Sequence, residues 1–401
     1  METVADEFGI AHFAPNGATL AVQRSVVPLT DQNRPLAANV NRLRGGGLAC
    51  ETTGHRGLLK RSSGVTHAQR KPVLLATMTP RTITSALLPV LLTLLSTAAA
   101  AQATPPRIFS PGVISGPAND LSPAFTPDGK TVFFTRSNSN QSTILVSHLS
   151  GGTWSKPRIA PFSGEWLDLE PTMAPDGSYL IFISSRPTET GGKPIDGFYN
   201  GAAQPGRGGN LWRVDHTSSG WGEPHRLPNI VNSNTSIYSP SIAADGSIYF
   251  MQPTGAKTRF HLFRAQFAHG EFEAPVEVPV SAGEDIGDFD PAVAPDESFM
   301  VFSSTRIAGK GTSLFITFHK NGAWSTPQYM GDTVSIPGAG SIEARLGGPG
   351  DRTLYFSNRY VEPATPPQSR ASSARGLELM AEWNNGLANI WQVSLAPWLD
   401  K

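Results

Sequence analysis

A pattern that repeats five times constrains this chain more than any other feature of its sequence. Each copy begins with a polar residue and a proline, passes through a turn of the Pro-Asp-Gly type, and ends in a β-branched and aromatic strand. The copies are DLSPAFTPDGKTVFFTRS (120–137), DLEPTMAPDGSYLIFISSR (168–186), IYSPSIAADGSIYFMQ (237–252), DFDPAVAPDESFMVFSSTR (288–306) and a degenerate SIEARLGGPGDRTLYFSNR (341–359). They recur at roughly 50 residues, with one longer interval, and a repeat of that length indicates a solenoid, propeller or array.

Further strand-like segments follow the copies. A third strand is apolar, as in ILVSHL (144–149), and a fourth begins with an aromatic residue followed by a proline, as in WSKP (154–157). Proline fits the outermost strand of a sheet because that strand needs no partner on its outer side. Four strands per repeat and no helical period predict the blade of a β-propeller.

The ring of blades is expected to close through the N-terminal part of this domain. The fifth copy has no fourth strand, but PPRIFSPGVISGPANDLSP (105–123) matches KPRIAPFSGEWLDLEP (156–171), which contains the fourth strand of the first blade. Closure of this kind would remove an exposed sheet edge. We therefore predict an all-β fold, a five-bladed β-propeller over 104–401, with a sixth, eroded blade in the long connections as the alternative.

The segment 78–103 has the composition of a signal peptide. A short basic region precedes the apolar run 83–95, and small residues end in an Ala-x-Ala site at 101–103. A run of about 13 residues is shorter than the about 20 that a membrane anchor needs. Thr/Ala-rich flanks and the lack of an amphipathic period argue against a buried core helix. The prediction is therefore a periplasmic or secreted protein with no stable membrane span after cleavage.

Residues 1–77 show no sustained period of either secondary structure. They are either a disordered basic extension or a spurious upstream extension before a true start at Met78. We favour the second interpretation, since a signal peptide acts only from an N-terminus. Cleavage near Ala103 would also remove Cys50, the one cysteine, and leave no thiol for a disulfide.

Charge and motifs exclude several classes of function. The chain has 32 Lys and Arg and 32 Asp and Glu, so its net charge is zero and nothing indicates a nucleic-acid partner. The histidines form no spaced pair of the kind that binds metal, and no metal site is predicted. No nucleophile elbow, phosphate loop or dinucleotide fingerprint occurs, so we predict no cofactor.

The repeat resembles the TolB-type, WD40-like propeller repeat in its Pro-x-x-x-x-Pro-Asp-Gly turn, the aromatic strand after it and the Ser-x-Arg ending. The resemblance covers most of 105–395 and implies a β-propeller. It says little about function, because such repeats occur in scaffolds and in hydrolases. The chain departs from this family in two ways. TolB has a separate N-terminal domain, and the family typically has six copies of the repeat, whereas this sequence shows five.

Charged residues recur at the start of strand one and the end of strand two, which share one face of a propeller. The acids at the repeat proline are Glu170, Asp290 and Glu343, and slightly earlier aspartates are Asp120, Asp168 and Asp288. The arginines are Arg136, Arg186, Arg306 and Arg359. A repeated acid and arginine favour structural ion pairs that tie blades together. Alternatively they form a funnel in which carboxylates hydrolyse a glycoside or arginines bind an acidic ligand.

Aromatic residues fall into two groups. Five lie in loops on the same face as the two long insertions, 187–209 and 360–385, and could stack on sugar rings or pack their own loops: Trp166, Tyr199, Tyr238, Tyr360 and Trp383. Four begin the fourth strands and are expected to pack between blades: Trp154, Trp221, Phe272 and Trp324.

Two functions are therefore compared. The first is a non-enzymatic binding or scaffold protein of the cell envelope, with a protein or glycan ligand at the loop-rich face of the funnel. The second is a carbohydrate-active enzyme, a glycoside hydrolase or lyase-like protein, that uses Glu170, Asp290 or Glu343. The accessibility of these three acids should distinguish the two.

Overall fold

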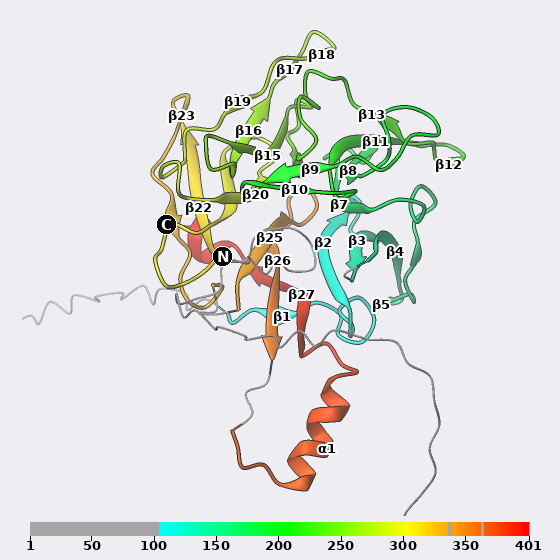
Figure 1. Ribbon diagram of the computed structural model, residues 1–401, viewed down its shortest axis with the longest axis vertical. Coiled ribbons are helices and arrows are strands. Elements are labelled where there is room, and N and C mark those ends of the chain that lie inside the picture. The colour runs from blue at the N-terminus through cyan, green and yellow to red at the C-terminus, as the bar shows by residue number, and fades with distance from the viewer. Residues whose placement is uncertain (1–103, 139, 336–338, 362–364, 401) are drawn as a thin grey trace, which may run out of the picture. The chain divides into compact units, whose positions relative to one another are not determined.

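A computed structural model describes residues 104–400 apart from 139, 336–338 and 362–364. The segments 1–77 and 78–103, to which the sequence assigns an extension and a signal peptide, lie outside the described residues. Five antiparallel sheets surround a common centre in Figure 1, each contributing its first strand to the middle of the ring. The predicted five-bladed β-propeller is therefore confirmed.

The blades share one order of strands. The innermost strands are β2 (Asn119–Phe125), β7 (Asp168–Met173), β14 (Tyr238–Ile242), β20 (Asp288–Val293) and β25 (Ser341–Leu346). The second strands are β3 (Thr131–Ser137), β8 (Tyr179–Ser184), β15 (Ile248–Thr254), β21 (Phe299–Ser304) and β26 (Thr353–Val361). The third strands are β4 (Ser142–Ser150), β11 (Asn210–Thr217), β16 (Arg259–Ala265), β22 (Ser313–Lys320) and β27 (Asn385–Ser394).

The fourth strands are short and, in several blades, broken in two. Their pieces are β5 (Thr153–Trp154), β6 (Arg158–Ile159), β12 (Gly220–Trp221), β13 (His225–Arg226), β19 (Val276–Glu277), β23 (Ala323–Trp324) and β24 (Gln328–Tyr329). In blade 1, Pro157 lies between β5 and β6. Because proline has no N–H to donate, the ladder to β4 stops at this point and resumes at β6.

The N-terminal strand completes the last blade, as predicted. β1 (Arg107–Ile108) pairs with β27 through Arg107 opposite Gln392 and Ile108 opposite Trp391. The Phe109 N–H extends this ladder by donating to the Ile390 carbonyl at 2.8 Å. The first and last parts of the described chain thus share one sheet.

The propeller has two faces, which we call the entry rim and the turn face. Asp168 at the start of β7 lies opposite Ser184 at the end of β8, so these ends define the entry rim. The Pro-Asp-Gly turns define the turn face. In blade 2, the Asp176 carboxylate accepts the Ser178 N–H at 2.9 Å while Gly177 adopts a φ of 75°, which explains the Asp-Gly pair.

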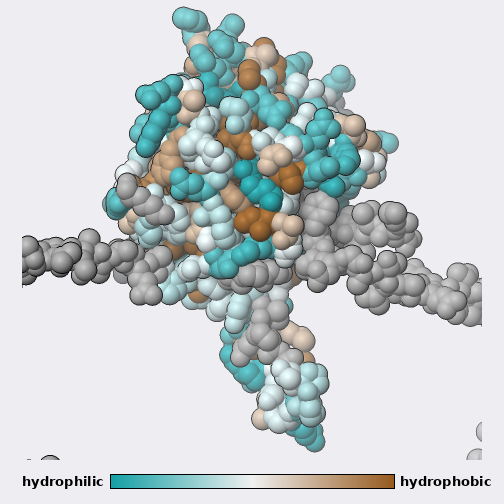
Figure 2. All heavy atoms as spheres, turned by 90° about the vertical axis from the view of Figure 1, so that its left-hand side faces the viewer, coloured by the Kyte–Doolittle hydropathy of each residue, from teal (hydrophilic) through white to brown (hydrophobic). Residues whose placement is uncertain are grey.

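The remaining elements extend the blades. Segment 187–209 on the entry rim forms a hairpin of β9 (Gly197–Tyr199) and β10 (Ala202–Gln204), and β17 (Phe267–Ala268) and β18 (Glu271–Phe272) form a second hairpin in blade 3. Figure 1 shows helix α1 (Arg370–Leu379), from the last insertion, standing away from the sheets, and the same part of the molecule projects at the bottom of Figure 2. The short helix α2 (Ala396–Leu399) follows β27. Within the described residues, none of the helices is long and apolar enough to cross a membrane.

The core consists of apolar clusters between neighbouring blades, not of one central cluster. The second strands are almost fully buried, with Phe134, Phe182 and Phe302 at 0% exposure. Three fourth-strand tryptophans contribute to these contacts as predicted. Trp221 of blade 2, for example, meets Phe133 of blade 1 edge-on at 5.2 Å. This arrangement leaves the axis of the propeller to polar side chains.

Candidate functional site

A ring of five polar side chains, one from each blade, occupies the centre of the propeller. We call it the central ring, and its members are Ser122, Glu170, Ser239, Asp290 and Glu343. All five have positive φ angles between 48° and 54°, a region that residues other than glycine rarely adopt. In each innermost strand the pairing register shifts at this residue. A bulge of this kind redirects one side chain per blade.

Hydrogen bonds link the central ring from blade to blade. The Ser239 N–H donates to Glu170 Oε2 at 2.6 Å, and the Ser239 hydroxyl donates to Asp290 Oδ1 at 2.7 Å. The Glu343 N–H donates to Asp290 Oδ2 at 2.8 Å. The Ser122 hydroxyl donates to Glu343 Oε2.

The circuit closes between blades 2 and 1. There the Glu170 N–H donates to the hydroxyl of Thr135 at 2.8 Å. All five blades are therefore joined by polar contacts at the axis, where a buried polar group without a partner would be costly.

One guanidinium interacts electrostatically with the two glutamates of the central ring. Arg345, two residues after Glu343 in β25, is 4% exposed, and its Nη1 donates to the Ala344 carbonyl at 2.8 Å. The Arg345 Nε and one oxygen of Glu170 are buried without a hydrogen-bond partner. The two glutamates thus share one arginine in a site that excludes bulk solvent.

Burial makes the two glutamates of the central ring hard to ionise. Burial raises the pKa of Glu343 to about 8, and the neighbouring charges of Glu170 and Asp290 add to the increase. Burial likewise raises the pKa of Glu170 to about 7, and Arg345 only partly offsets this. The ring therefore retains a proton at neutral pH.

Metal binding is a separate question. The described residues contain no group of three or more His, Cys, Asp or Glu that could hold a metal ion.

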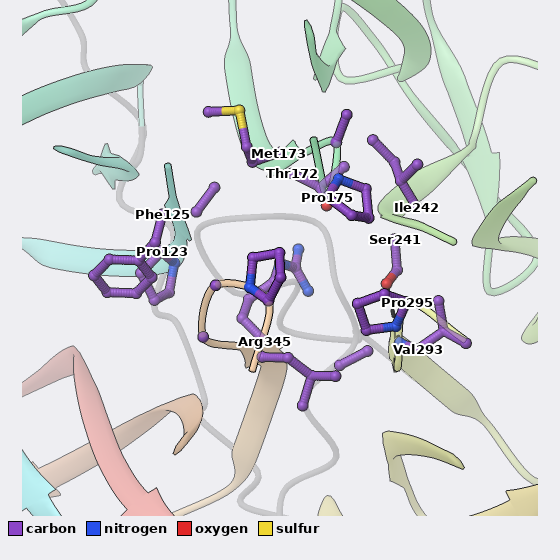
Figure 3. A pocket seen from close by; sticks show the side chains of 17 residues that line it. Pro123, Phe125, Thr172, Met173, Pro175, Ser241, Ile242, Val293, Pro295 and Arg345 are labelled. Carbon is purple, nitrogen blue, oxygen red and sulfur yellow. Dashed lines mark hydrogen bonds between the residues drawn. The ribbon is translucent and has the colours of Figure 1, made fainter. Parts of the chain in front are cut away.

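A small axial pocket lies on the turn-face side of the central ring. Figure 3 shows side chains from all five blades around the Arg345 guanidinium, including Pro123, Pro175, Ser241 and Pro295. Its volume of about 60 Å³ has room for a few water molecules. Ligand pockets typically measure about 300 to 1,000 Å³, so a sugar does not fit here. The carboxylates are 1–3% exposed and are closed to a substrate of that size.

The arginines that end the second strands pair with the earlier aspartates and not with the central ring. Arg136 Nε lies 2.6 Å from Asp120, Arg306 Nη2 lies 2.7 Å from Asp288, and Arg186 pairs with Asp168. Each arginine also donates to a carbonyl of the segment entering its blade, at Ile114, Val280 and Phe162. These contacts tie one blade to the connection from the previous one. Arg359 lies near the end of β26, and Ser341 takes the place of the aspartate in this blade.

The proposed stacking aromatics differ in accessibility. Tyr199 is 1% exposed and packs against Phe260 at 5.4 Å, so it has no face available for a ligand. Trp166 is half-buried in the loop before β7. Tyr360 stacks on Trp383 at 6.0 Å, and both are half-buried beside the last insertion.

A larger cleft lies on the entry rim, and we call it the rim cleft. Its volume of about 260 Å³ is just below the lower end of the usual range for ligand pockets and more than four times that of the axial pocket. It is lined by the loop between β3 and β4, by the entry to β7, by 205–208 of the insertion and by Tyr238. Asn138, Asn140, Gln141 and Arg207 supply amide and guanidinium groups. The Tyr238 hydroxyl donates to the Arg207 carbonyl at 2.5 Å and fixes the insertion over blade 3.

Sequence reasoning identified the three carboxylates but missed Arg345, Thr135, Ser122 and Ser239 as members of one site. A signal for Arg345 exists in the aligned repeats. The positions equivalent to Arg345 are Ala124, Thr172, Ser241 and Ala292, all small. A single arginine at a position that is otherwise small marks a place where one blade departs from the common pattern.

The sequence matches no protein-family model and no curated protein. The structure is similar to TolB from Agrobacterium tumefaciens, with 16% identity, a TM-score of 0.39, and coverage of 60% of this chain and 70% of that one. TolB from Acinetobacter baumannii has 14% identity and a TM-score of 0.38, and the match covers 69% of this chain and 54% of that one. This chain therefore spans about half the length of that protein. An α-L-arabinofuranosidase from Podospora anserina in complex with cellotriose has 12% identity and a TM-score of 0.42, and the match covers 72% of this chain and 96% of that one. TolB proteins are thus among the similar structures, and function must be inferred from this chain's own side chains.

Proposed function

We propose that this chain is a binding protein of the cell envelope, periplasmic or secreted, which takes a polar ligand in the rim cleft. A glycan is the first candidate ligand and a polar protein segment the second. The envelope location rests on the signal-peptide composition of 78–103. The rim cleft as ligand site rests on its geometry.

The observation that carries the proposal is the contrast between the two polar sites. The rim cleft is open and presents the exposed side chains of Asn140 and Gln141. Amide groups donate and accept hydrogen bonds at once, which suits the hydroxyl groups of sugars. The loops that form the cleft are held by a rigid propeller, the usual arrangement of a binding site.

Catalysis at the central ring is not favoured. A glycosidase needs two carboxyl groups that both reach the scissile bond. Glu170, Asp290 and Glu343 are nearly inaccessible, and the axial pocket beside them is too small for a sugar. Their hydrogen bonds link blades instead, which supports a structural role.

A thermal-shift screen tests the proposal. Residues 104–401 are incubated with soluble oligosaccharides and muropeptides, and a ligand at 100 times its Kd should add about 2.7 kcal/mol to the free energy of unfolding. The double variant Asn140→Ala, Gln141→Ala removes exposed side chains and should abolish the shift. Gln328→Ala, an exposed position on β24 of blade 4, is the matched control and should retain it. If no probe shifts the melting temperature, or if the double variant responds as the wild type does, the rim cleft is not the binding site.

A further inference from the structure

Four of the five interfaces between blades are filled by a tryptophan. Trp221 and Trp324 reach across to Phe133 of blade 1 and Tyr249 of blade 3. Trp154 of blade 1 meets Phe109, which follows β1 of blade 5, at 5.8 Å. Trp398 of α2 shares an apolar cluster with Val301 of blade 4 and Leu354 of blade 5.

Among the described residues, no tryptophan lies in the interface between blades 2 and 3. Phe272 occupies the fourth-strand position in blade 3, and it packs against Phe267 of its own hairpin at 4.9 Å. A cleft of about 450 Å³ remains beside it. We call it the blade 2/3 cleft, and its apolar lining includes Tyr179, Ile181, Leu227, Ala243, Phe267 and Phe272.

The mouth of the blade 2/3 cleft is acidic. Asp176 and Asp245, from the turns of blades 2 and 3, line it, and both are exposed. Arg213 also lines it, but its guanidinium lies over the Tyr179 ring at 3.8 Å and pairs with Asp215 at 2.7 Å. Arg264 approaches Asp245 only at 3.5 Å. A ligand at the mouth therefore meets the exposed Asp176 carboxylate, the Asp245 carboxylate with its distant Arg264 partner, and Arg213, which is already paired.

We propose that the blade 2/3 cleft binds a tryptophan side chain of a protein partner, flanked in that partner by a basic residue. The indole would occupy the position that an intramolecular tryptophan takes at the other four interfaces. The basic group would meet Asp176 and Asp245 at the mouth. A cleft of this volume falls within the usual range of ligand pockets, about 300 to 1,000 Å³.

This site is separate from the rim cleft. The blade 2/3 cleft is lined by turn-face residues such as Pro175 and Gly246, whereas the rim cleft lies at the opposite ends of the strands. The proposal therefore goes beyond the polar ligand proposed above, and either can fail without the other. An aromatic anchor in an apolar pocket with charges at its edge is the usual composition of a protein-binding hot spot.

The test uses fluorescein-labelled peptides of the sequences GKWKG, GKAKG and GEWEG, followed by fluorescence polarisation. The full domain is compared with Phe272→Trp, which supplies the missing indole from within the chain. GKWKG should bind, with the other two peptides at least about tenfold weaker. The Phe272→Trp variant should fold, because other blades accommodate a tryptophan at this position. It should weaken the binding of GKWKG by at least about tenfold.

Two further variants keep the test informative if Phe272→Trp does not fold. Ala244→Arg places a cation and a long side chain at an exposed position of the mouth and should also abolish binding. Asp176→Asn should weaken the binding of GKWKG. Asp296 is the equivalent turn residue of blade 4, and Asp296→Asn should leave this binding unchanged. Absence of binding at millimolar peptide, equal binding of GKWKG and GKAKG, or binding unaffected by Ala244→Arg and Phe272→Trp would overturn the proposal.

Discussion

The carboxyl groups of the central ring predict that the folded domain loses stability as the pH rises through neutrality. In the folded state the pKa of Glu170 is raised from 4.5 to about 7 and that of Glu343 to about 8, mainly by burial. An unfolded chain exposes both groups and restores their ordinary pKa. Between about pH 4.5 and 8 the folded state therefore binds more protons than the unfolded state, and the free energy of unfolding falls with rising pH.

The magnitude follows from the two pKa values. A difference of one pH unit between the folded and unfolded pKa corresponds to about 1.4 kcal/mol. Glu170 then contributes about 3 kcal/mol and Glu343 about 5 kcal/mol of lost stability above pH 8. Because the two carboxyls interact, about 8 kcal/mol is the upper limit for the pair. Domains typically have a free energy of unfolding of about 5 to 15 kcal/mol, so the effect is large.

Urea titrations followed by circular dichroism between about pH 6 and 9 measure this dependence. Glu343→Gln keeps an acceptor oxygen for the Ser122 hydroxyl but removes the charge. This variant should lose less stability with pH than the wild type and should be more stable than it at pH 9. Glu271→Gln, on an exposed residue of β18, should retain the wild-type slope. A wild-type stability that is flat or rises over this range, or an unchanged slope in Glu343→Gln, would refute the reasoning.

Two further predictions concern the packing between blades and a buried ion pair within blade 2. Trp221→Ala should lower the free energy of unfolding by about 3 to 5 kcal/mol, because it leaves a cavity beside Phe133 and Phe162; urea titration measures it, and a loss below 1 kcal/mol would contradict the packing described. Arg186→Ala should cost about 3 to 5 kcal/mol by leaving Asp168 buried without its guanidinium, and adding Asp168→Asn should recover most of the loss. Arg352→Ala, which breaks an exposed pair with Asp400, should cost less than about 1 kcal/mol in the same assay and serves as its control.

The architecture was accessible from the sequence because each blade repeats the same local chemistry. Proline, an Asp-Gly turn and a β-branched strand place the strand boundaries in most copies, and the match of 105–123 to 156–171 located the closing strand. All of this depends on residues near one another in the chain. The repeat therefore predicted the number of blades without any knowledge of how side chains meet at the axis.

The partners of the charged residues could not be predicted in the same way. Asp168 and Glu170 are two residues apart, so strand alternation alone assigns both to one face. The bulge at Glu170, with its positive φ, separates them, so that Asp168 meets Arg186 while Glu170 meets Ser239 of the next blade. The burial of Tyr199 was also inaccessible, because the hairpin that carries it is absent from the other blades.

The pairing of β1 with β27 determines when this protein can finish folding. Arg107 and Gln392 meet across one ladder, although translation separates them by nearly the whole domain. At about 5 to 20 residues per second, a ribosome needs roughly 15 to 60 s to make the intervening chain. For that interval the first strand has no partner, and the seam of the ring stays open until β27 emerges. Closure therefore follows the synthesis of all five blades, and any nascent chain that stalls before blade 5 carries an unsealed sheet edge at each end.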